Sequence, residues 1–407
     1  MRLDRRALIA GLLVSGTARA QVAQTSPSGL YEFGPAVAQV DFHARLDRPV
    51  VLRSAEMLKV DGKHEFVRVV SEDGIEGVVK ANSRMAEVAS LFHLVAKPRL
   101  VGEDMRDIEA LIQALYVREY KFAGLAFWTA VGHIELSVWD MLGKTAGVRC
   151  VDFMGPVLRT EIPIYISSLR RNTTPEEEVA WLAREVEQTG ARGVKIKIGN
   201  RMSRNADAAP GRSEGVVKAV REYFGDDFTI YADANGSYDA PRAIEVCRML
   251  ESYGVALVEE PCPYEDVEMT KQVVGRVDIP VAGGEQDGSA ERWRWYLEHG
   301  GLDVLQPDFM YNGGMCRTLA VQRAALARGV GVAPHYPRNG SETVELLHFA
   351  AQAANLHGLQ EYRGQPRDLD FAHEPIVSPR GGSISLPPGP GFGITFDPGL
   401  WSPAERL

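Results

Sequence analysis

The sequence lacks the features that mark membrane-spanning, disulfide-framework and nucleic-acid-binding proteins. None of its apolar runs reaches the roughly 20 residues that a transmembrane helix needs. The 407 residues include only 4 cysteines, so we expect buried free thiols and not a disulfide scaffold. Basic residues are outnumbered, with 45 Lys and Arg against 54 Asp and Glu, and the net charge of −9 opposes binding to a phosphate backbone. We therefore expect neither a membrane nor a nucleic acid as a partner.

What the sequence does contain at its N-terminus is typical of a secretory signal peptide. Three arginines among the first six residues precede the apolar residues 7–16, and small residues at 18–20 provide a cleavage site. The Arg5-Arg6 pair directly before the apolar stretch is typical of a twin-arginine signal. We expect residues 1–20 to be removed and the mature protein to be periplasmic or exported. The alternative is a frayed basic N-terminus on a cytoplasmic protein.

The first part of the mature chain, residues 30–155, has the pattern of an α+β domain. Alternating apolar residues end in a predicted hairpin around Asp73-Gly74, within residues 67–79. From residue 84 to residue 143 the apolar spacing becomes helical. The wider composition, 45% apolar and 24% charged, is that of a globular protein.

Residues 156–365 alternate short apolar runs with amphipathic helices. One helix is predicted to begin after Thr174, with a proline at its first position, and to end at Gly190. The eight apolar runs are residues 162–168, 193–199, 228–234, 255–260, 279–285, 302–307, 330–334 and 357–361. Eight runs separated by helices favour a closed parallel barrel over an open sheet. Residues 366–407, rich in Gly and Pro, are expected to return to the first domain.

Charged residues stand at the ends of these predicted strands. The steps from Asp233 to Glu259, Glu285, Asp308 and His335 are 26, 26, 23 and 27 residues, each about one strand-helix unit. Such spacing places the side chains on one rim of the barrel, where barrel active sites lie. Three converging carboxylates repel one another unless a hard dication lies between them, so Asp233, Glu259 and Glu285 predict a Mg²⁺ site. Taken singly, each could instead be a solvated loop charge.

Lys195 and Lys197 lie on the same side of one predicted strand, because side chains alternate along a strand. We expect each ammonium group to lower the pKa of the other, as a general base near neutral pH requires. Asp308 and His335 end adjacent strands, and an Asp that binds an imidazole N–H fixes its tautomer. The alternatives are a solvated lysine pair and a structural histidine.

At these strand ends the sequence resembles the enolase superfamily, specifically its mandelate racemase branch. The resemblance rests on Lys195-Ile196-Lys197, Asp233-Ala234-Asn235, Glu259-Glu260-Pro261, Gly284-Glu285, Asp308 ahead of Gly313-Gly314, and His335. Residues 138–144 also resemble the helix that joins the capping domain to the barrel in that family. The likeness covers nearly the whole mature chain. It implies a modified TIM barrel, (β/α)₇β, with an N-terminal α+β capping domain and one Mg²⁺ per active site.

The resemblance implies abstraction of the proton α to a carboxylate, through an ene-diolate. We expect Mg²⁺ and Lys195 to hold the carboxylate, and Lys197 or His335 to remove the proton. Glu361 is expected to hydrogen-bond the ene-diolate. The favoured activity is that of an acid-sugar dehydratase, a hydro-lyase that forms a 2-keto-3-deoxy acid. A racemase or epimerase is the alternative, and an exported, non-catalytic acid-sugar-binding protein is the alternative of another class.

The substrate is expected to be a small carboxylate, bound in a homo-oligomer. Asn235 and Arg338 are candidate substrate-binding residues, and Arg338 could equally pair with Glu342. Specificity is expected from the capping domain, around Arg53 and residues 82–84. The long polar loop at residues 201–215 is either a mobile flap or a solvated insertion.

Overall fold

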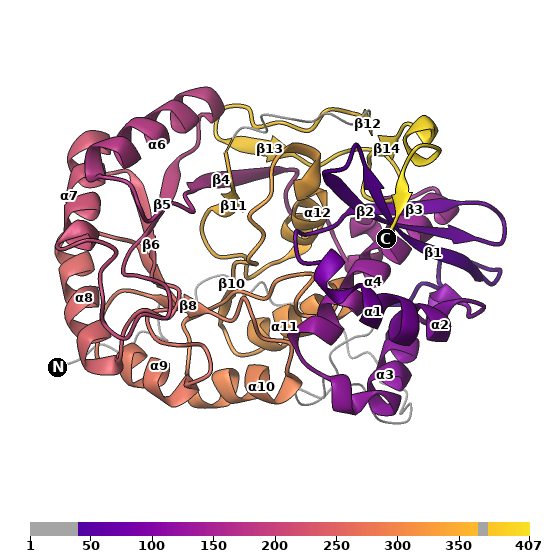
Figure 1. Ribbon diagram of the computed structural model, residues 1–407, viewed down its shortest axis with the longest axis horizontal. Helices are drawn as coiled ribbons and strands as arrows, with labels where there is room; N and C mark the ends of the chain where they lie inside the picture. The colour runs from indigo at the N-terminus through magenta and orange to yellow at the C-terminus, as the bar shows by residue number, and fades with distance from the viewer. Residues whose placement is uncertain (1–39, 365–372) are drawn as a thin grey trace, which may run out of the picture.

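The structure is a computed structural model that describes residues 40–364 and 373–407. The expected signal peptide, residues 1–20, lies outside the described residues. Figure 1 shows the barrel with its outer helices on one side of the molecule, and the capping domain with the C-terminal segment on the other. In the described part of the chain, no helix has both the length and the apolar character needed to cross a bilayer.

The capping domain is built on an antiparallel meander of β1 (Leu52–Val60), β2 (His64–Ser71) and β3 (Glu76–Lys80). The predicted hairpin is confirmed, and Gly74 adopts the left-handed φ of +84° that its turn requires. The last strand of the chain, β15 (Glu405–Arg406), pairs antiparallel with β1. The helices that follow the meander are α1 (Ala89–Leu91), α2 (Lys97–Leu100), α3 (Ile108–Arg118), α4 (Leu125–Ala146) and α5 (Val151–Met154).

Each of the eight predicted apolar runs overlaps a strand of the barrel. In chain order these strands are β4 (Glu161–Ser167), β5 (Gly193–Lys197), β6 (Thr229–Asp233), β7 (Leu257–Glu259), β8 (Val281–Gly283), β9 (Val304–Leu305), β10 (Gly331–Val332) and β11 (Gln360–Tyr362). Each pairs parallel with the next from β4 to β10, and β11 pairs parallel with β4. A parallel bridge between Val332 and Leu356 closes the ring. The predicted closed barrel is therefore confirmed.

The helices of the barrel cover the outside of the strands (Figure 1). They are α6 (Pro175–Thr189), α7 (Arg212–Phe224), α8 (Ala240–Ser252), α9 (Val267–Val274), α10 (Ala290–His299), α11 (Met315–Leu326) and α12 (Val344–Gln352). The predicted start of α6 is confirmed, because Thr174 and Glu177 form a reciprocal capping box. Its predicted end is confirmed by Gly190, which adopts φ +70°.

Helix α4 joins the capping domain to the barrel through buried carboxylates. Glu135 accepts hydrogen bonds from the backbone N–H of Met315 (2.7 Å) and of Cys316 (2.8 Å), at the start of α11. Asp140 accepts from the N–H of Val78 in β3 at 2.9 Å. Since these donors belong to separate elements, the two side chains fix the orientation of α4 against both the barrel and the meander.

The C-terminal segment lies against both domains. β12 (His373–Glu374) pairs with β14 (Thr395–Phe396), and β13 (Ser383–Ser385) pairs antiparallel with β4 of the barrel. A short helical turn, Pro398–Trp401, precedes β15. All four cysteines are buried and free, as the sequence predicted.

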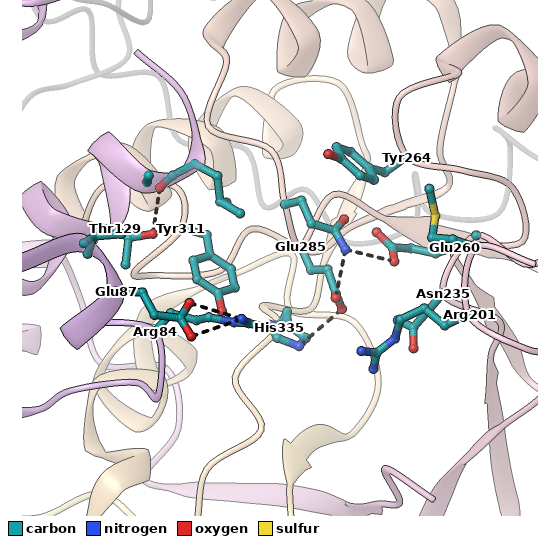
Figure 2. A pocket seen from close by; sticks show the side chains of 16 residues that line it. Arg84, Glu87, Thr129, Arg201, Asn235, Glu260, Tyr264, Glu285, Tyr311 and His335 are labelled. Carbon is teal, nitrogen blue, oxygen red and sulfur yellow. Dashed lines mark hydrogen bonds and ion pairs between the residues drawn. The ribbon is translucent and has the colours of Figure 1, made fainter. Parts of the chain in front are cut away.

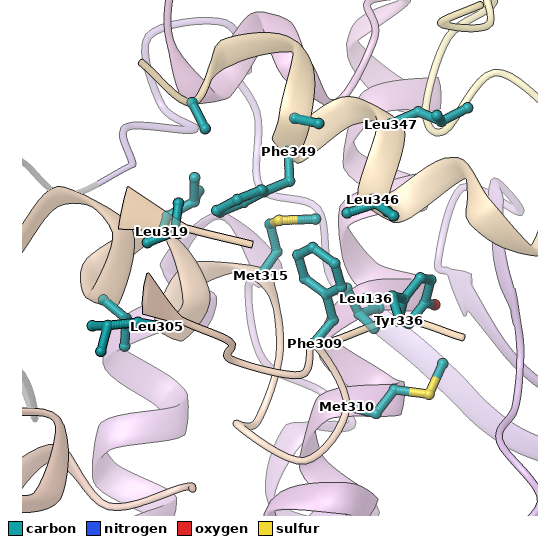
Figure 3. Packing of buried hydrophobic residues seen from close by; sticks show 14 of the residues in the cluster. Leu136, Leu305, Phe309, Met310, Met315, Leu319, Tyr336, Leu346, Leu347 and Phe349 are labelled. Atoms are coloured by element: carbon teal, nitrogen blue, oxygen red, sulfur yellow. The ribbon is translucent and has the colours of Figure 1, made fainter. Parts of the chain in front are cut away.

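A cluster of apolar side chains packs beneath the connection from β9 to α11. Figure 3 shows Phe309 among side chains from three helices, Leu136 of α4, Met315 of α11 and Phe349 of α12. The rings of Phe309 and Phe349 have centroids 5.4 Å apart and meet at 74°. This packing fixes the backbone that directly follows Asp308.

Candidate active site

Three neighbouring strands bring the first candidate residues into register. Lys197 at the end of β5 is paired with Asp233 at the end of β6, and Asp233 is paired with Glu259 at the end of β7. Glu285 follows β8, the next strand in the sheet. Carboxylate oxygens of Asp233, Glu259 and Glu285 lie within 4.8 Å of one another.

This carboxylate group fits a hard dication. Oε1 of Glu259 is buried and has no hydrogen-bond partner among the described residues, so a donor or a cation is needed beside it. Burial, with the negative charge of Asp233 nearby, raises the pKa of Glu259 to about 7. Lys197 holds the pKa of Asp233 well below its usual range, against the effect of burial. Three oxygen donors in a small volume are the set that Mg²⁺ takes in proteins.

Lys195 lies at the buried floor of the site, 1% exposed, between two carboxylates. Its Nζ is 2.8 Å from Oε2 of Glu259 and 2.9 Å from Oε1 of Glu361. Although burial opposes the ammonium form, these carboxylates raise the pKa of Lys195 well above its ordinary value. The expectation that the two lysines lower each other's pKa is therefore wrong for Lys195, because its nearest charges are negative.

Lys197 contacts two side chains from the end of β6. It donates to Oδ2 of Asp233 and, at 3.1 Å, to Oδ1 of Asn235. Asn235 has φ +42°, which is uncommon outside glycine, and its backbone N–H donates to Oδ1 of Asp233 at 2.8 Å. The turn after β6 therefore points Asn235 back toward the lysine.

Asp308 and His335 are in direct contact. Nδ1 of His335 is 2.9 Å from Oδ2 of Asp308, and its Nε2 is 3.2 Å from Oε2 of Glu285. The other oxygen of Asp308 accepts from the N–H of Met310 at 2.8 Å and of Tyr311 at 2.9 Å. Burial opposes the imidazolium form, yet Glu285 and Asp308 raise the pKa of His335 to about 10.

Glu361, in β11, completes the floor of the site. Its Oε1 accepts from the Ser167 hydroxyl at 2.7 Å, and its Oε2 from the N–H of Tyr336 at 2.9 Å. Despite burial, Lys195 and His335 lower the pKa of Glu361 to about 2. The carboxylate is thus held ionised and in a fixed orientation.

A cavity of about 550 Å³ opens above these residues, between the barrel and the capping domain. Barrel residues on its wall include Asn235, Glu260, Glu285 and His335, as Figure 2 shows. The capping domain and the loops add residues that the sequence analysis did not identify as site residues, among them Glu87, Thr129, Arg201 and Tyr311. No local pattern identifies Thr129, because it reaches the cavity only through the packing of α4 on the barrel.

Two of the expected specificity residues lie elsewhere. Arg338 is not on the cavity wall; it donates to the carbonyl of Ala81 at 3.3 Å and lies 3.8 Å from Glu342. Arg53 is also absent from the wall, whereas Arg84 lines the cavity. Arg338 therefore contacts the capping-domain loop that carries Arg84, and not the space where a substrate would lie.

The comparisons with known proteins agree with this geometry. Residues 43–155 match the mandelate racemase / muconate lactonizing enzyme N-terminal domain, and residues 178–400 match the enolase C-terminal domain-like family. The chain is 29% identical over 356 residues to D-galactonate dehydratase from Ralstonia nicotianae, covering 82% of this chain and 89% of that protein. It is 27% identical over 318 residues to arabinonate dehydratase from Saccharolobus solfataricus, covering 75% and 80%.

The structure is also similar to a solved one. A mandelate racemase/muconate lactonizing protein from Paracoccus denitrificans, complexed with magnesium, superposes with a TM-score of 0.80 at 28% identity, over 88% of this chain and 99% of that one. The enolase-like family model alone spans more than half of the sequence. The chain therefore belongs to the enolase superfamily, in its mandelate racemase branch.

Proposed function

We propose that this protein is a Mg²⁺-dependent acid-sugar dehydratase that forms a 2-keto-3-deoxy acid. The observation that carries the proposal is the placement of Lys197 and His335 on strands that lie across the barrel from each other, with the carboxylate group between them. Relatives named as galactonate, arabinonate and gluconate dehydratases support this reaction class.

Asp233, Glu259 and Glu285 would hold the Mg²⁺, and Lys195 would bind the substrate carboxylate. When bound, Mg²⁺ supplies positive charge that stabilises the negative charge developing on that carboxylate. Glu361, oriented by Ser167, would hydrogen-bond the ene-diolate.

Proton transfer is assigned to Lys197 and His335, which lie on either side of the strands that carry the carboxylate group. Lys197 takes the α-proton of the acid sugar at Nζ, which leaves an ene-diolate. The C–O bond to the β-hydroxyl then breaks, and protonated His335 supplies the proton with which it leaves as water. Asp308 keeps the imidazole in the orientation for this transfer. The enol that remains becomes the 2-keto-3-deoxy acid.

Racemisation is the second candidate function, and the same placement favours it. With Lys197 and His335 on opposite sides of the substrate, one can remove the α-proton from one face of the α-carbon and the other can return a proton to the opposite face. Binding without catalysis does not require two proton-transfer groups, so this pair argues against a non-catalytic binding protein.

The test is turnover and α-proton exchange in D₂O by the Mg²⁺-loaded protein with a panel of aldonic acids. We expect His335→Asn to lose dehydration by about 10² to 10⁴, the contribution of one general acid, while exchange by Lys197 continues. A matched control is His299→Asn, on an exposed histidine at the end of α10 that does not line the cavity. Near-normal dehydration by His335→Asn would refute the assignment, and absence of any exchange by the native protein would refute enzymatic function.

We also propose that the protein is exported through the twin-arginine route. Replacing Arg5-Arg6 by Lys-Lys should retain the precursor in the cytoplasm, whereas the native chain should yield a mature N-terminus near Gln21. Recovery of the native chain with residues 1–20 intact in the cytoplasm would contradict this proposal.

A further inference from the structure

One basic side chain at the mouth of the cavity, Arg201, has surroundings that differ from those of the other arginine on the wall. Arg201 is exposed and lines the cavity, and Figure 2 shows its guanidinium directed inward beside Asn235. Across residues 40–364 and 373–407, it forms no ion pair with a carboxylate. Arg84, the other arginine on the wall, is already paired with Glu87 at 3.2 Å. Arg201 therefore differs from Arg84 in having its charge available.

The loop that carries Arg201 is fixed to the barrel. The N–H of Met202 donates to the carbonyl of Asn235 at 3.0 Å, and the N–H of Asn205 donates to the carbonyl of Ser237 at 2.7 Å. Asn205 and Asp239 also exchange two hydrogen bonds, at 2.8 and 2.9 Å. This loop is held against the connection from β6 to α8, which argues against a detached flap, and it presents Arg201 from a pre-organised backbone.

A second guanidinium lies close to the first. Arg171 donates to Oδ1 of Asn235 at 2.7 Å, and its Nε is buried and has no hydrogen-bond partner in the part of the chain that the structure describes. Burial lowers the pKa of Arg171; the negative charge of Asp233 opposes this effect, and the positive charge of Arg201 adds to it. Two neighbouring guanidinium groups repel each other, and an anion bound beside them would relieve that repulsion.

Arg201 and Lys195 are both cationic groups that could bind a carboxylate, and they lie at different depths of the cavity. Lys195 is 1% exposed at the floor, whereas Arg201 is exposed at the rim. Three acidic residues share the wall with Arg201, and none of them forms an ion pair with it in the described part of the chain. Glu285 belongs to the carboxylate group, and Glu260 accepts from Gln286 at 3.4 Å.

We propose that Arg201 binds a second carboxylate, at the far end of the substrate. The preferred substrates are then aldaric acids, which carry a carboxylate at both ends, over aldonic acids of the same configuration. This inference rests on the proposed function in one respect: the substrate carboxylate next to the reacting carbon binds at the floor of the site, near Lys195. It goes beyond the relatives, whose names specify acids with a single carboxylate.

The test compares the affinity of the Mg²⁺-loaded protein for matched pairs of acids by calorimetry. Galactarate is paired with galactonate and glucarate with gluconate, so that the members of each pair differ at the far end. We expect at least one aldarate to bind about tenfold more tightly than its aldonate, which is one charge-assisted contact. Arg201→Gln should abolish this preference, because it should lower the affinity for the aldarate more than the affinity for the aldonate.

Arg204→Gln is the matched control, because Arg204 lies in the same loop, is exposed and does not line the cavity. It should retain the preference for the aldarate. Equal affinity for both acids of every pair, absence of binding by any of them, or a preference that survives Arg201→Gln would overturn the inference. If the protein prefers the aldarate but dehydrates neither acid, that result would contradict only the proposed dehydration.

Discussion

The rings of Phe309 and Tyr336 pack edge to face, with centroids 5.1 Å apart and planes at 87°, and each directly follows a member of the Asp308 and His335 pair. Both rings are buried, at 0% and 1% exposure. A hydrogen bond of 2.9 Å between Asp308 and His335 is thus supported from below by aromatic packing between their neighbours. The orientation of the imidazole depends on a core contact as well as on its carboxylate partner.

We predict that Phe309→Leu lowers kcat by more than the accompanying loss of unfolding free energy can explain. The smaller side chain loses the ring contact and costs about 1 kcal/mol of unfolding free energy. Because the backbone after Asp308 is then less constrained, kcat should fall several-fold while Tm changes little. Phe92→Leu, at an equally buried phenylalanine of the capping domain, is the control. Equal effects of the two substitutions on kcat would show that Phe309 has no special role.

A second prediction concerns the metal. Glu259→Gln removes the charge of a buried carboxylate whose Oε1 has no partner in the described structure. We expect Mg²⁺ binding, measured by calorimetry without substrate, to weaken by at least about tenfold, which is 1.4 kcal/mol. The fold should remain intact, because the single amide oxygen of glutamine can replace Oε2 of Glu259, which in the native protein accepts from Lys195 and Gln306 at 2.8 Å each. Unchanged Mg²⁺ affinity would exclude Glu259 as a ligand.

The barrel and the register of its rim residues could be predicted from the sequence because they follow from repeated local patterns. One strand-helix unit separates Asp233 from Glu259, and parallel pairing of the two strands then brings these residues opposite each other. The same reasoning placed Asp308 ahead of His335. The capping box at Thr174 was predictable for the same reason, since it depends on four consecutive residues.

The contacts that could not be predicted are those between distant segments. Arg338 was expected at the substrate, yet it contacts the carbonyl of Ala81, more than two hundred residues away in the chain. The high pKa of Lys195 depends on Glu361, at the far end of the barrel domain. Spacing along a strand shows that the two lysines lie on the same side of it. It does not show which carboxylates from other strands lie closest to each lysine.

The buried His133 should make stability depend on pH. Its Nδ1 contacts the carbonyl of Thr129 at 2.7 Å, and the N–H of Asn82 donates to its Nε2 at 3.1 Å, so the ring is neutral. Burial lowers its pKa from 6.5 to about 4. Below pH 6.5 the unfolded chain binds a proton that the folded protein does not, so stability falls as the pH drops toward 4.

This single group accounts for about 3 kcal/mol of acid destabilisation. We predict that His133→Gln reduces the loss of unfolding free energy between about pH 7 and about pH 5, measured by urea denaturation. His299→Gln, at an exposed histidine, should leave that loss unchanged. If the His133→Gln protein loses as much stability over this range as the native protein, the pKa of His133 in the fold is not lowered.

The last prediction concerns Arg338, which we assign to positioning and not to substrate contact. Its guanidinium donates to the carbonyl of Ala81 at 3.3 Å and to Sδ of Met310 at 3.0 Å, so it connects the barrel to the loop that carries Arg84. Arg338→Met keeps an apolar stem but removes the donor to Ala81. Since Arg84 lines the cavity, a looser loop should raise KM several-fold.

The value of kcat should change little, because the Asp308 and His335 pair does not depend on the loop. Arg338→Lys can still donate to the carbonyl of Ala81 and should recover much of the native KM, which a purely structural loss would not predict. Arg242→Met, at an exposed arginine paired with Glu245, serves as the control for removing a charge. An equal fall in kcat and kcat/KM for Arg338→Met would mean that Arg338 acts on the transition state, and the positioning role would be wrong.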